Sequence, residues 1–293
     1  EISGAKNAAL PLMAASLLTD GALALGNLPH VSDIATMTEL LVELGVDINM
    51  NGKSADGSRE NGGSEGRLLS LSARNLVSGT APYDLVRKMR ASVLVLGPLL
   101  ARAGHAKVSM PGGCAIGLRP VDLHVAGLRQ LGAEISLRDG YIEAKAPSGL
   151  VGANIVFPTV SVGATANLMM AACLARGETT ITNAACEPEI VDLADCLSRM
   201  GANIGGAGTG RIQVVGVDRL GSAEHKVLPD RIETGTYAIA AAITGGTLDL
   251  IGTTIDLIQT VADTLRAVGI ELTVCENGVR VKPGGNRLSP VNI

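Results

Sequence analysis

The residues best suited to chemistry lie in the segment MPGGCAIGLRP, which runs from Met110 to Pro120. Cys114 stands between two glycines on one side and Gly117 and Arg119 on the other. Glycine allows positive φ angles and lets a ligand approach the backbone closely. A thiol becomes a useful acid or nucleophile when nearby cations lower its pKa. The segment predicts a reactive thiol in a glycine-rich loop, although composition alone leaves an inert, buried cysteine equally open.

The other cysteines and the histidines form no further site by spacing. Cys186 occupies a similar loop, but Glu187 and Glu189 beside it disfavour a thiolate. The five cysteines lack CxxC spacing, which favours a reducing compartment over a disulfide framework. The four histidines are dispersed, so we expect no metal site and no cofactor held by one.

Several cations stand at the expected ends of elements. Lys6 precedes Asn7 at the start of a helix, and Arg90 and Arg119 lie in YDLVRKMRAS and the cysteine segment. Phosphates and carboxylates are held by such groups, by arginine in bidentate fashion. Each cation taken singly is more often a solvated surface charge. The segment TVSVGAT places Ser161 to Gly163 at a helix N-terminus, where backbone N–H groups can contact an anion.

Composition excludes several classes of protein. The chain has 293 residues, 46% of them hydrophobic but only 1% aromatic, and a formal net charge of −4. We therefore expect an aliphatic core, no stacking on nucleic-acid bases and no general attraction to nucleic acid or anionic membrane. No run of about 20 apolar residues is present, and residues 1–10 lack a signal-peptide layout. We expect a cytoplasmic protein; the sequence leaves the oligomeric state open.

Two series of glycines mark an internal repeat. LLVELGVDI, GLRQLGAEI, CLSRMGANI and TLRAVGIEL each end a helical pattern with a glycine and then begin a strand, at Gly45, Gly132, Gly201 and Gly269. SLLTDGALAL, LLARAGHAKV, CLARGETTI and AITGGTLDL precede them in step. The pattern predicts an α/β protein with four copies of a helix, strand, loop, helix, strand, strand unit of about 70 residues.

The pattern also places the elements. Helices are expected at 6–19, 33–44, 84–102, 120–131, 162–175, 188–200, 234–243 and 257–268. Strands are expected at 22–25, 107–110 and 179–182, and a further strand is expected to end at residue 251. The tract Gly52–Gly66 is predicted to be an exposed insertion, and GGAGTG at 205–210 a turn between two short strands. Three repeats, from Lys6 to about Leu228, form a domain, whereas a lone fourth repeat is a poor domain and suggests a missing C-terminal part.

These segments together resemble one family. GAKNAALPLMAA, APYDLVRKMRAS, MPGGCAIGLRPVDLH, VSVGAT, EPEIVD and LPDRIETGTY are similar to the UDP-N-acetylglucosamine 1-carboxyvinyltransferases, enolpyruvyl transferases of peptidoglycan synthesis. The resemblance implies two inside-out α/β barrel domains, each of three βαβαββ repeats. It assigns residues 5–228 to a three-repeat domain, and residues 1–4 with 229–293 to a second domain that holds one of an expected three repeats.

The resemblance also implies a reaction without a cofactor: phosphoenolpyruvate and UDP-N-acetylglucosamine give the 3-O-enolpyruvyl sugar nucleotide and phosphate. Lys6, Arg90 and Arg119 would hold phosphoenolpyruvate, Asn7 would contact the sugar, and Cys114 would be the general acid and the target of fosfomycin. The residues lining the sugar-nucleotide site would be Arg119, Pro120, Val121, Asp122, Leu123, Ser161, Val162 and Gly163. Asp230, Arg231 and Glu233 match the family's segment that enters the second domain.

The sequence departs from this family at two points. Ser32 stands where a lysine is often found, and the family's aspartate base and further arginines would lie beyond Ile293. The rival functions are a shikimate-type enolpyruvyl transferase, a non-catalytic sugar-nucleotide binder and a thiol redox protein. Cys114 and VSVGAT speak against the first, and the lack of a CxxC pair speaks against the last.

Overall fold

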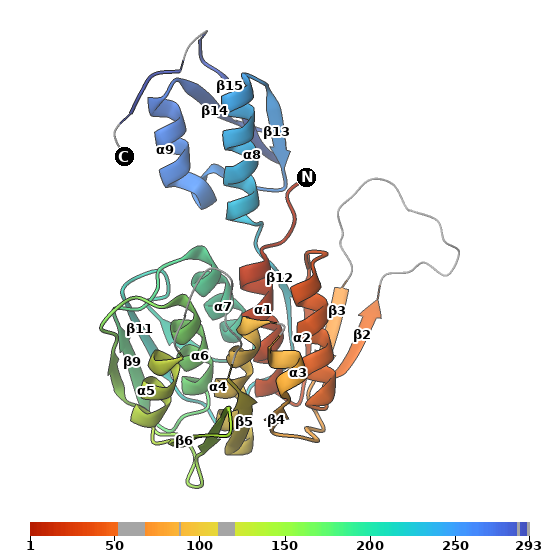
Figure 1. Ribbon diagram of the computed structural model, residues 1–293, viewed down its shortest axis with the longest axis vertical. Coiled ribbons are helices and arrows are strands. Elements are labelled where there is room, and N and C mark those ends of the chain that lie inside the picture. Colours follow the sequence, from red (N-terminus) through yellow and green to blue (C-terminus); the bar gives the residue numbers. More distant parts are fainter. Residues whose placement is uncertain (52–67, 88, 111–120, 286–287, 292–293) are drawn as a thin grey trace. The chain divides into compact units, whose positions relative to one another are not determined.

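A computed structural model describes residues 1–51, 68–87, 89–110, 121–285 and 288–291. Contacts divide the chain into two units (Figure 1). Residues 6–227 form what we call the three-sheet unit; residues 1–5 and 228–293 form the one-sheet unit. The chain thus crosses between the units after Ala5 and after Val227, one residue from the boundary expected at each crossing.

Three repeats build the three-sheet unit. The helices of the first repeat are α1 (Lys6–Ala15), η1 (Ser16–Leu18) and α2 (Ser32–Glu43); its strands are β1 (Ala22–Gly26), β2 (Asp47–Asn51) and β3 (Leu68–Ser72). The second has β4 (Thr80–Ala81), α3 (Tyr83–Val86), η2 (Arg90–Val95), α4 (Leu96–Ala103), β5 (His105–Ser109), α5 (Asp122–Gln130), β6 (Glu134–Arg138) and β7 (Tyr141–Lys145). The third has β8 (Asn154–Val156), α6 (Val162–Ala172), β9 (Glu178–Thr182), α7 (Pro188–Arg199), β10 (Asn203–Gly205) and β11 (Arg211–Val215), and β12 (Ala223–Lys226) follows.

The three sheets share one topology. Their strand orders are β12-β1-β3-β2, β4-β5-β7-β6 and β8-β9-β11-β10. The first-named strand pairs parallel with its neighbour, and the other pairs are antiparallel. Because β12 from the end of the third repeat joins the sheet of the first, the three repeats close into a ring.

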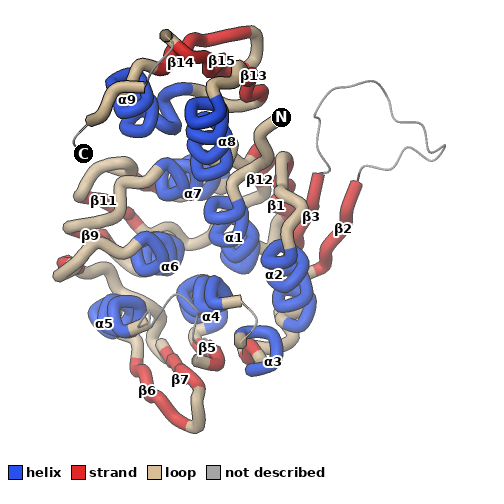
Figure 2. Tube along the Cα trace, turned by 45° about the horizontal axis from the view of Figure 1, so that its top comes forward, coloured by secondary structure: helices blue, strands red, loops and turns tan. Residues whose placement is uncertain are grey.

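Helices fill the inside of this ring and sheets cover it, as Figures 1 and 2 show. All side chains from Ala8 to Ala15 in α1 and from Ala164 to Ala172 in α6 are buried. The strands instead alternate: Ile142 and Ala144 of β7, like Ile212 and Val214 of β11, are buried between more exposed neighbours. Helices that are apolar all round must be buried, whereas sheets with one apolar face can cover a core. This is the inside-out arrangement that the family resemblance implied.

The glycine series is confirmed. Gly45, Gly132, Gly201 and Gly269 all have left-handed φ angles, between 92° and 105°. These angles satisfy the last helical carbonyls and turn the chain into the next strand at little cost for glycine alone. The 205–210 turn is also confirmed, since it connects β10 to β11. The tract 52–66 lies outside the described residues; the strands that flank it, β2 and β3, pair with each other.

One expected helix was wrong. The predicted helix 84–102 is three pieces: α3, η2 and α4. Pro98 has no N–H to donate to Leu94, and the α-helix begins just before it, where proline is tolerated. One residue earlier, the N–H of Gly97 donates to the side-chain oxygen of Asn167, 2.8 Å away, instead of closing an α-helical turn.

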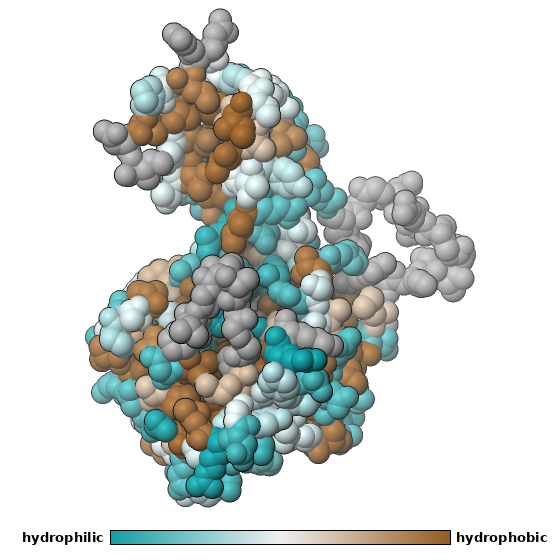
Figure 3. All heavy atoms as spheres, viewed as in Figure 1, coloured by the Kyte–Doolittle hydropathy of each residue, from teal (hydrophilic) through white to brown (hydrophobic). Residues whose placement is uncertain are grey.

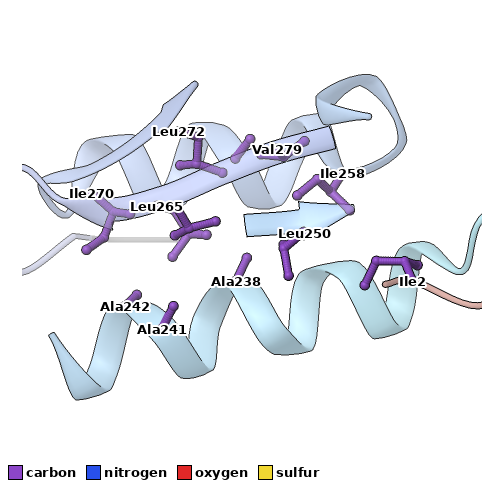
Figure 4. Close-up of a cluster of buried hydrophobic side chains, with 12 residues drawn as sticks. Ile2, Ala238, Ala241, Ala242, Leu250, Ile258, Leu265, Ile270, Leu272 and Val279 are labelled. Atoms are coloured by element: carbon purple, nitrogen blue, oxygen red, sulfur yellow. The ribbon is translucent and has the colours of Figure 1, made fainter. Parts of the chain in front are cut away.

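The one-sheet unit repeats the pattern once. Its elements are α8 (Arg231–Thr244), β13 (Leu248–Ile251), η3 (Ile255–Ile258), α9 (Gln259–Ala267), β14 (Ile270–Cys275) and β15 (Gly278–Pro283), with sheet order β13-β15-β14. The N-terminal residues belong here: Ile2 donates its N–H to Ile251 and packs into the core (Figure 4). That core also contains Ala238, Leu250 and Val279.

Part of this unit's apolar surface is uncovered. On α8, the side chains of Ile232, Tyr237, Ile239 and Ile243 are all exposed, Ile243 to 72%. Figure 3 shows apolar surface gathered over this unit. Among the described residues, no helix is long and apolar enough to cross a membrane.

Candidate functional site

Lys6 and Asn7 occupy the first turn of α1, as expected. The Lys6 ammonium lies 2.8 Å from a carboxylate oxygen of Asp33, and both side chains are partly exposed. Asp33 sits in the first turn of α2, where a negative charge complements the helix dipole. The α1 cation therefore has a flexible carboxylate partner and remains within reach of solvent, so an anionic ligand would share it with Asp33. Asn7 is exposed beside it.

Arg90 begins η2, directly after the point where the expected helix breaks. Asn167 of α6 bridges a second break, the junction between η2 and α4, from 70 residues away. Its side-chain oxygen accepts from the N–H of Gly97, and its side-chain nitrogen donates to the carbonyl of Val93 at 3.1 Å. Val93 and Gly97 are the two residues that an uninterrupted α-helix would bond to each other. The carboxamide thus takes the place of one backbone hydrogen bond of the helix and fixes the segment that carries Arg90.

His124 on α5 is the third member of this network. Its Nδ1 lies 2.9 Å from the side-chain nitrogen of Asn167, and the side chain is only 5% exposed. Burial lowers the pKa of His124 to about 4; the positive charge of Arg90 contributes, and Asp122 opposes it. The imidazole is therefore neutral at neutral pH. Sequence reasoning missed both His124 and Asn167.

The start of α5 carries three expected residues. The helix begins at Asp122, whereas Pro120 was predicted. Val121 precedes it and is buried, Asp122 is exposed in the first turn, and Leu123 is intermediate. Cys114, Arg119 and Pro120 lie outside the described residues.

The N-terminus of α6 carries the other expected group. The Ser161 side chain caps the helix by accepting from the N–H of Ala164 at 3.3 Å, and its carbonyl accepts from Thr165. Val162 and Gly163 form the first turn. The His124 ring packs against that turn, with Cε1 and Nε2 each 3.4 Å from the position that a Gly163 side chain would take.

The described thiols differ in accessibility. Burial raises the pKa of both Cys173 and Cys196 to about 12, so these two are inert spacers in the core. Cys186, the rival loop thiol, is exposed. No group of three or more potential metal ligands occurs among the described residues.

Asp230, Arg231 and Glu233 lie in the one-sheet unit, at the start of α8. Asp230 caps the helix by accepting from the N–H groups of Ile232 and Glu233 at 2.8 and 3.0 Å. Glu233 accepts from the N–H and hydroxyl of Ser3. These two carboxylates therefore have structural partners inside their own unit, which the sequence motif alone did not indicate.

Within the three-sheet unit, the elements that carry the described site residues pack on one another. Helix α1 packs against η2, η2 packs against α6, and α6 packs against α5. The structure thus brings Lys6, Arg90, Asp122 and the Ser161 turn onto one set of adjoining elements. Cationic groups and a helix N-terminus on adjoining elements are suited to binding a multiply charged anion.

The sequence model of the EPSP synthase (3-phosphoshikimate 1-carboxyvinyltransferase) family matches residues 1–293. The chain belongs to this family. It is 61% identical over all of its residues to the UDP-N-acetylglucosamine 1-carboxyvinyltransferase of Rhodospirillum centenum, and covers 67% of that protein. It is 56% identical to the protein of the same name from Paramagnetospirillum magneticum, of which it covers 66%. The resemblance seen in the motifs is confirmed, and the chain spans about two thirds of these relatives.

Solved structures of enolpyruvyl transferases have the same fold as this chain. The enolpyruvyl transferase NikO from Streptomyces tendae superposes with a TM-score of 0.79 at 20% identity, over 99% of this chain and 66% of that one. EPSP synthase from Acinetobacter baumannii gives a TM-score of 0.73 at 19% identity, over 100% and 66%. The predicted enolpyruvyl transferase fold is confirmed.

Proposed function

We propose that this chain carries the enolpyruvyl transfer site for phosphoenolpyruvate and UDP-N-acetylglucosamine. The observation that carries this proposal is the 61% identity, over its whole length, to a UDP-N-acetylglucosamine 1-carboxyvinyltransferase. The products are the 3-O-enolpyruvyl sugar nucleotide and phosphate, and the reaction is the first committed step of peptidoglycan synthesis. The place of action is the cytoplasm, in keeping with cysteines that are scattered along the sequence without CxxC spacing.

The chemistry is addition followed by elimination. The sugar 3-hydroxyl gives its proton to a base as its oxygen bonds to C2 of phosphoenolpyruvate, and the methylene carbon takes a proton from the Cys114 thiol, giving a tetrahedral ketal phosphate. Loss of a methyl proton then restores the double bond and expels phosphate. Cys114 is the general acid for the first step and the thiol that fosfomycin would alkylate. An acid whose pKa lies near the working pH exchanges a proton readily.

Cationic side chains bind phosphoenolpyruvate. Lys6, Arg90 and Arg119 hold the phosphate and carboxylate of phosphoenolpyruvate, and their charges favour the Cys114 thiolate. Support comes from the packing of α1, η2 and α6 on one another, which puts Lys6 and Arg90 on adjoining elements. The Lys6–Asp33 pair is exposed enough to rearrange when an anion arrives.

The sugar nucleotide occupies the neighbouring turns. Asn7 contacts the sugar, and residues 119–123 and 161–163 line the uridine-diphosphate site. The free N–H groups at the start of α6 support this assignment, since such groups bind phosphate oxygens. Asp230, Arg231 and Glu233 are further candidate substrate-binding residues, in addition to their structural roles.

The one-sheet unit is one repeat of a three-repeat domain. Supporting this, β1, β5 and β9 each have a parallel partner strand, whereas β13 has none among the described residues. The family's remaining arginines and its aspartate base belong to the part of the relatives that this chain does not span.

The decisive test is phosphate release from phosphoenolpyruvate by this chain, with and without UDP-N-acetylglucosamine. Release that requires the sugar nucleotide supports the proposal. If shikimate 3-phosphate replaces the sugar nucleotide, the transferase is of the shikimate type instead. If phosphate is not released but UDP-N-acetylglucosamine binds in calorimetry, the chain by itself is a sugar-nucleotide binder.

A further inference from the structure

The segment η2, whose first residue is Arg90, follows the tighter 3-10 pattern of hydrogen bonds. The N–H of Leu96 donates to the carbonyl of Val93, three residues before it. In an α-helix that carbonyl would accept from the N–H of Gly97, four residues after it. Both groups turn instead to Asn167 of α6: the N–H of Gly97 donates to its Oδ1 at 2.8 Å, and its Nδ2 donates to the carbonyl of Val93 at 3.1 Å. One carboxamide therefore occupies both ends of the α-type bond.

Three hydrogen bonds fix the orientation of this carboxamide. The backbone N–H of Gly97 can only donate, so the atom of Asn167 that it meets is the oxygen. The nitrogen then gives one hydrogen to the carbonyl of Val93 and the other to Nδ1 of His124, 2.9 Å away. Asn167 is fully buried, so solvent cannot replace these partners. The side chain acts as a rigid wedge between α6 and the η2–α4 junction.

The wedge can reach two backbone groups because α4 and α6 come very close together here. A β-carbon on Gly97 would overlap both the side-chain oxygen and the backbone oxygen of Asn167. Glycine is therefore required at this point of α4, and a side chain as short as that of asparagine spans the gap.

The choice between the two hydrogen-bond patterns sets the direction in which Arg90 points. A 3-10 helix turns about 120° and rises about 2.0 Å per residue, against about 100° and 1.5 Å for an α-helix. Over the three steps from Arg90 to Val93 the difference is about 60° around the axis and about 1.5 Å along it. A bidentate arginine loses its alignment with a phosphate or carboxylate after a displacement of that size.

We propose that Asn167 is a positioning residue for enolpyruvyl transfer: it holds η2 in the 3-10 form and so sets the place from which Arg90 meets its anion. This inference rests on the proposed binding of phosphoenolpyruvate by Arg90. Asn167 touches no substrate and acts only through the backbone of η2.

A double-mutant cycle tests whether Asn167 acts through Arg90. The readout is the Kd of phosphoenolpyruvate for the full chain, measured by calorimetry with UDP-N-acetylglucosamine present. Asn167→Ala leaves the groups of Val93 and Gly97 to bond each other, and should raise this Kd about 10-fold. In an Arg90→Ala background the same substitution should have no further effect. An unchanged Kd in Asn167→Ala, or effects of the two substitutions that simply add, would overturn the proposal.

Two further variants separate positioning from general packing. Leu168→Ala removes the next side chain of α6, which is fully buried and lies against Gly127 of α5. It should lower the Tm at least as much as Asn167→Ala, yet leave the Kd of phosphoenolpyruvate within about 2-fold. An equal rise in Kd would mean that loss of packing alone explains the effect.

Pro98 is the local alternative to Asn167, because it offers no N–H to the carbonyl of Leu94 and so also disfavours an α-helix. Pro98→Ala should leave the Kd of phosphoenolpyruvate within about 3-fold, since Asn167 still occupies Val93 and Gly97. If Pro98→Ala raises the Kd and Asn167→Ala does not, the proline holds η2 and the proposal is wrong.

The position of Arg90 can also be measured without substrate, by comparing crystal structures of the wild type and Asn167→Ala. In the variant the nitrogen of Gly97 should lie about 3 Å from the carbonyl oxygen of Val93, and the Cα of Arg90 should move by more than about 1 Å. If Asn167→Ala does not fold, Asn167→Ser serves in both experiments, because its hydroxyl can bond to the preceding turn of α6 and leaves the bridge open. An Arg90 that stays in place would contradict the inference.

Failure of the proposed function gives a different result. A wild-type chain that neither binds phosphoenolpyruvate nor releases phosphate would count against that function. The crystal structures would still decide whether Asn167 sets the position of Arg90.

Discussion

The first helix of the repeat is buried to different extents in the two units of this chain. In the three-sheet unit, α6 is buried on every side from Ala164 to Ala172. In the one-sheet unit, α8 is the corresponding helix, yet Ile232, Ile239 and Ile243 are exposed. A helix of this kind buries one side under its own sheet and needs other helices for the rest. The comparison teaches that the sequence pattern recurs once in each repeat, whereas full burial of the repeat's first helix requires a ring of three repeats.

The largest effect should come from placing a charge on each helix in turn. Ala171 of α6 is fully buried and Ile239 of α8 is 45% exposed, and each lies six residues before the left-handed glycine, Gly177 or Gly245, that precedes the next strand. Ala171→Lys should cost about 4 kcal/mol or prevent folding, because an unpaired ammonium would be buried. Ile239→Lys should stay within about 0.5 kcal/mol. Urea unfolding followed by hydrogen exchange, which reports each unit separately, measures both; a large loss from Ile239→Lys would mean that the α8 face is covered.

Two helical glycines give the next largest contrast. A methyl group on Gly97 would overlap the side-chain and backbone oxygens of Asn167, whereas one on Gly235 would meet only Val261 methyls at 3.9 Å. Gly97→Ala should destabilise the three-sheet unit by about 3 kcal/mol. Gly235→Ala should be neutral or stabilise α8 by up to about 1 kcal/mol. Thermal unfolding of the two variants tests this, and equal shifts in Tm would contradict the bridging role of Asn167.

Acid should also distinguish the units. All four histidines lie in the three-sheet unit. In the unfolded chain His124 takes up a proton as the pH falls below its ordinary pKa of 6.5, but in the folded unit it does so only near 4. Stability is therefore fully present above pH 6.5 and declines by roughly 3 kcal/mol between 6.5 and 4.

The check is urea unfolding at pH 7.5, 6 and 5 for the wild type and for His124→Gln. The variant should lose less stability across this window. If both lose the same amount, His124 is not the group that titrates.

The smallest contrast concerns the helix caps. Asp230 holds two N–H groups of α8, whereas Ser161 holds one of α6 at 3.3 Å. Asp230→Ala should cost about 1–2 kcal/mol and Ser161→Ala about 0.5 kcal/mol. Circular dichroism during thermal unfolding measures these losses. In Asp230→Ala, a loss of sugar-nucleotide binding free energy larger than the loss of unfolding free energy would reveal a binding role beside the structural one.

The sequence predicted those features that single residues encode. A left-handed turn after a helix needs glycine, so Gly45, Gly132, Gly201 and Gly269 could be identified from position alone. The break before Pro98 could not be predicted locally, because it is completed by Asn167, 70 residues further on. Strand β4 was missed for a similar reason: two residues have no periodicity, and only pairing with β5 makes them a strand.

The candidate site divides in the same way. Lys6, Arg90 and Ser161 could be proposed from the sequence because they begin elements and belong to motifs. His124 and Asn167 have no motif. A signal was nevertheless present: Asn167 is the polar interruption in the apolar run ATANLMMAA, and such a residue in a buried helix must find hydrogen-bond partners.

The closure of the three repeats by β12 also matters to the chain that surrounds them. The three-sheet unit interrupts the one-sheet unit between Ala5 and Leu228, yet the N–H of Ala5 donates to the carbonyl of Leu228 at 2.8 Å. A flexible excursion of that length would burden the host fold with a loop-closure entropy of about 5 kcal/mol. Because the closed ring brings the two ends of the three-sheet unit together, its insertion adds little loop-closure entropy to the folding of the one-sheet unit. Domain insertions are tolerated in engineered proteins for the same reason.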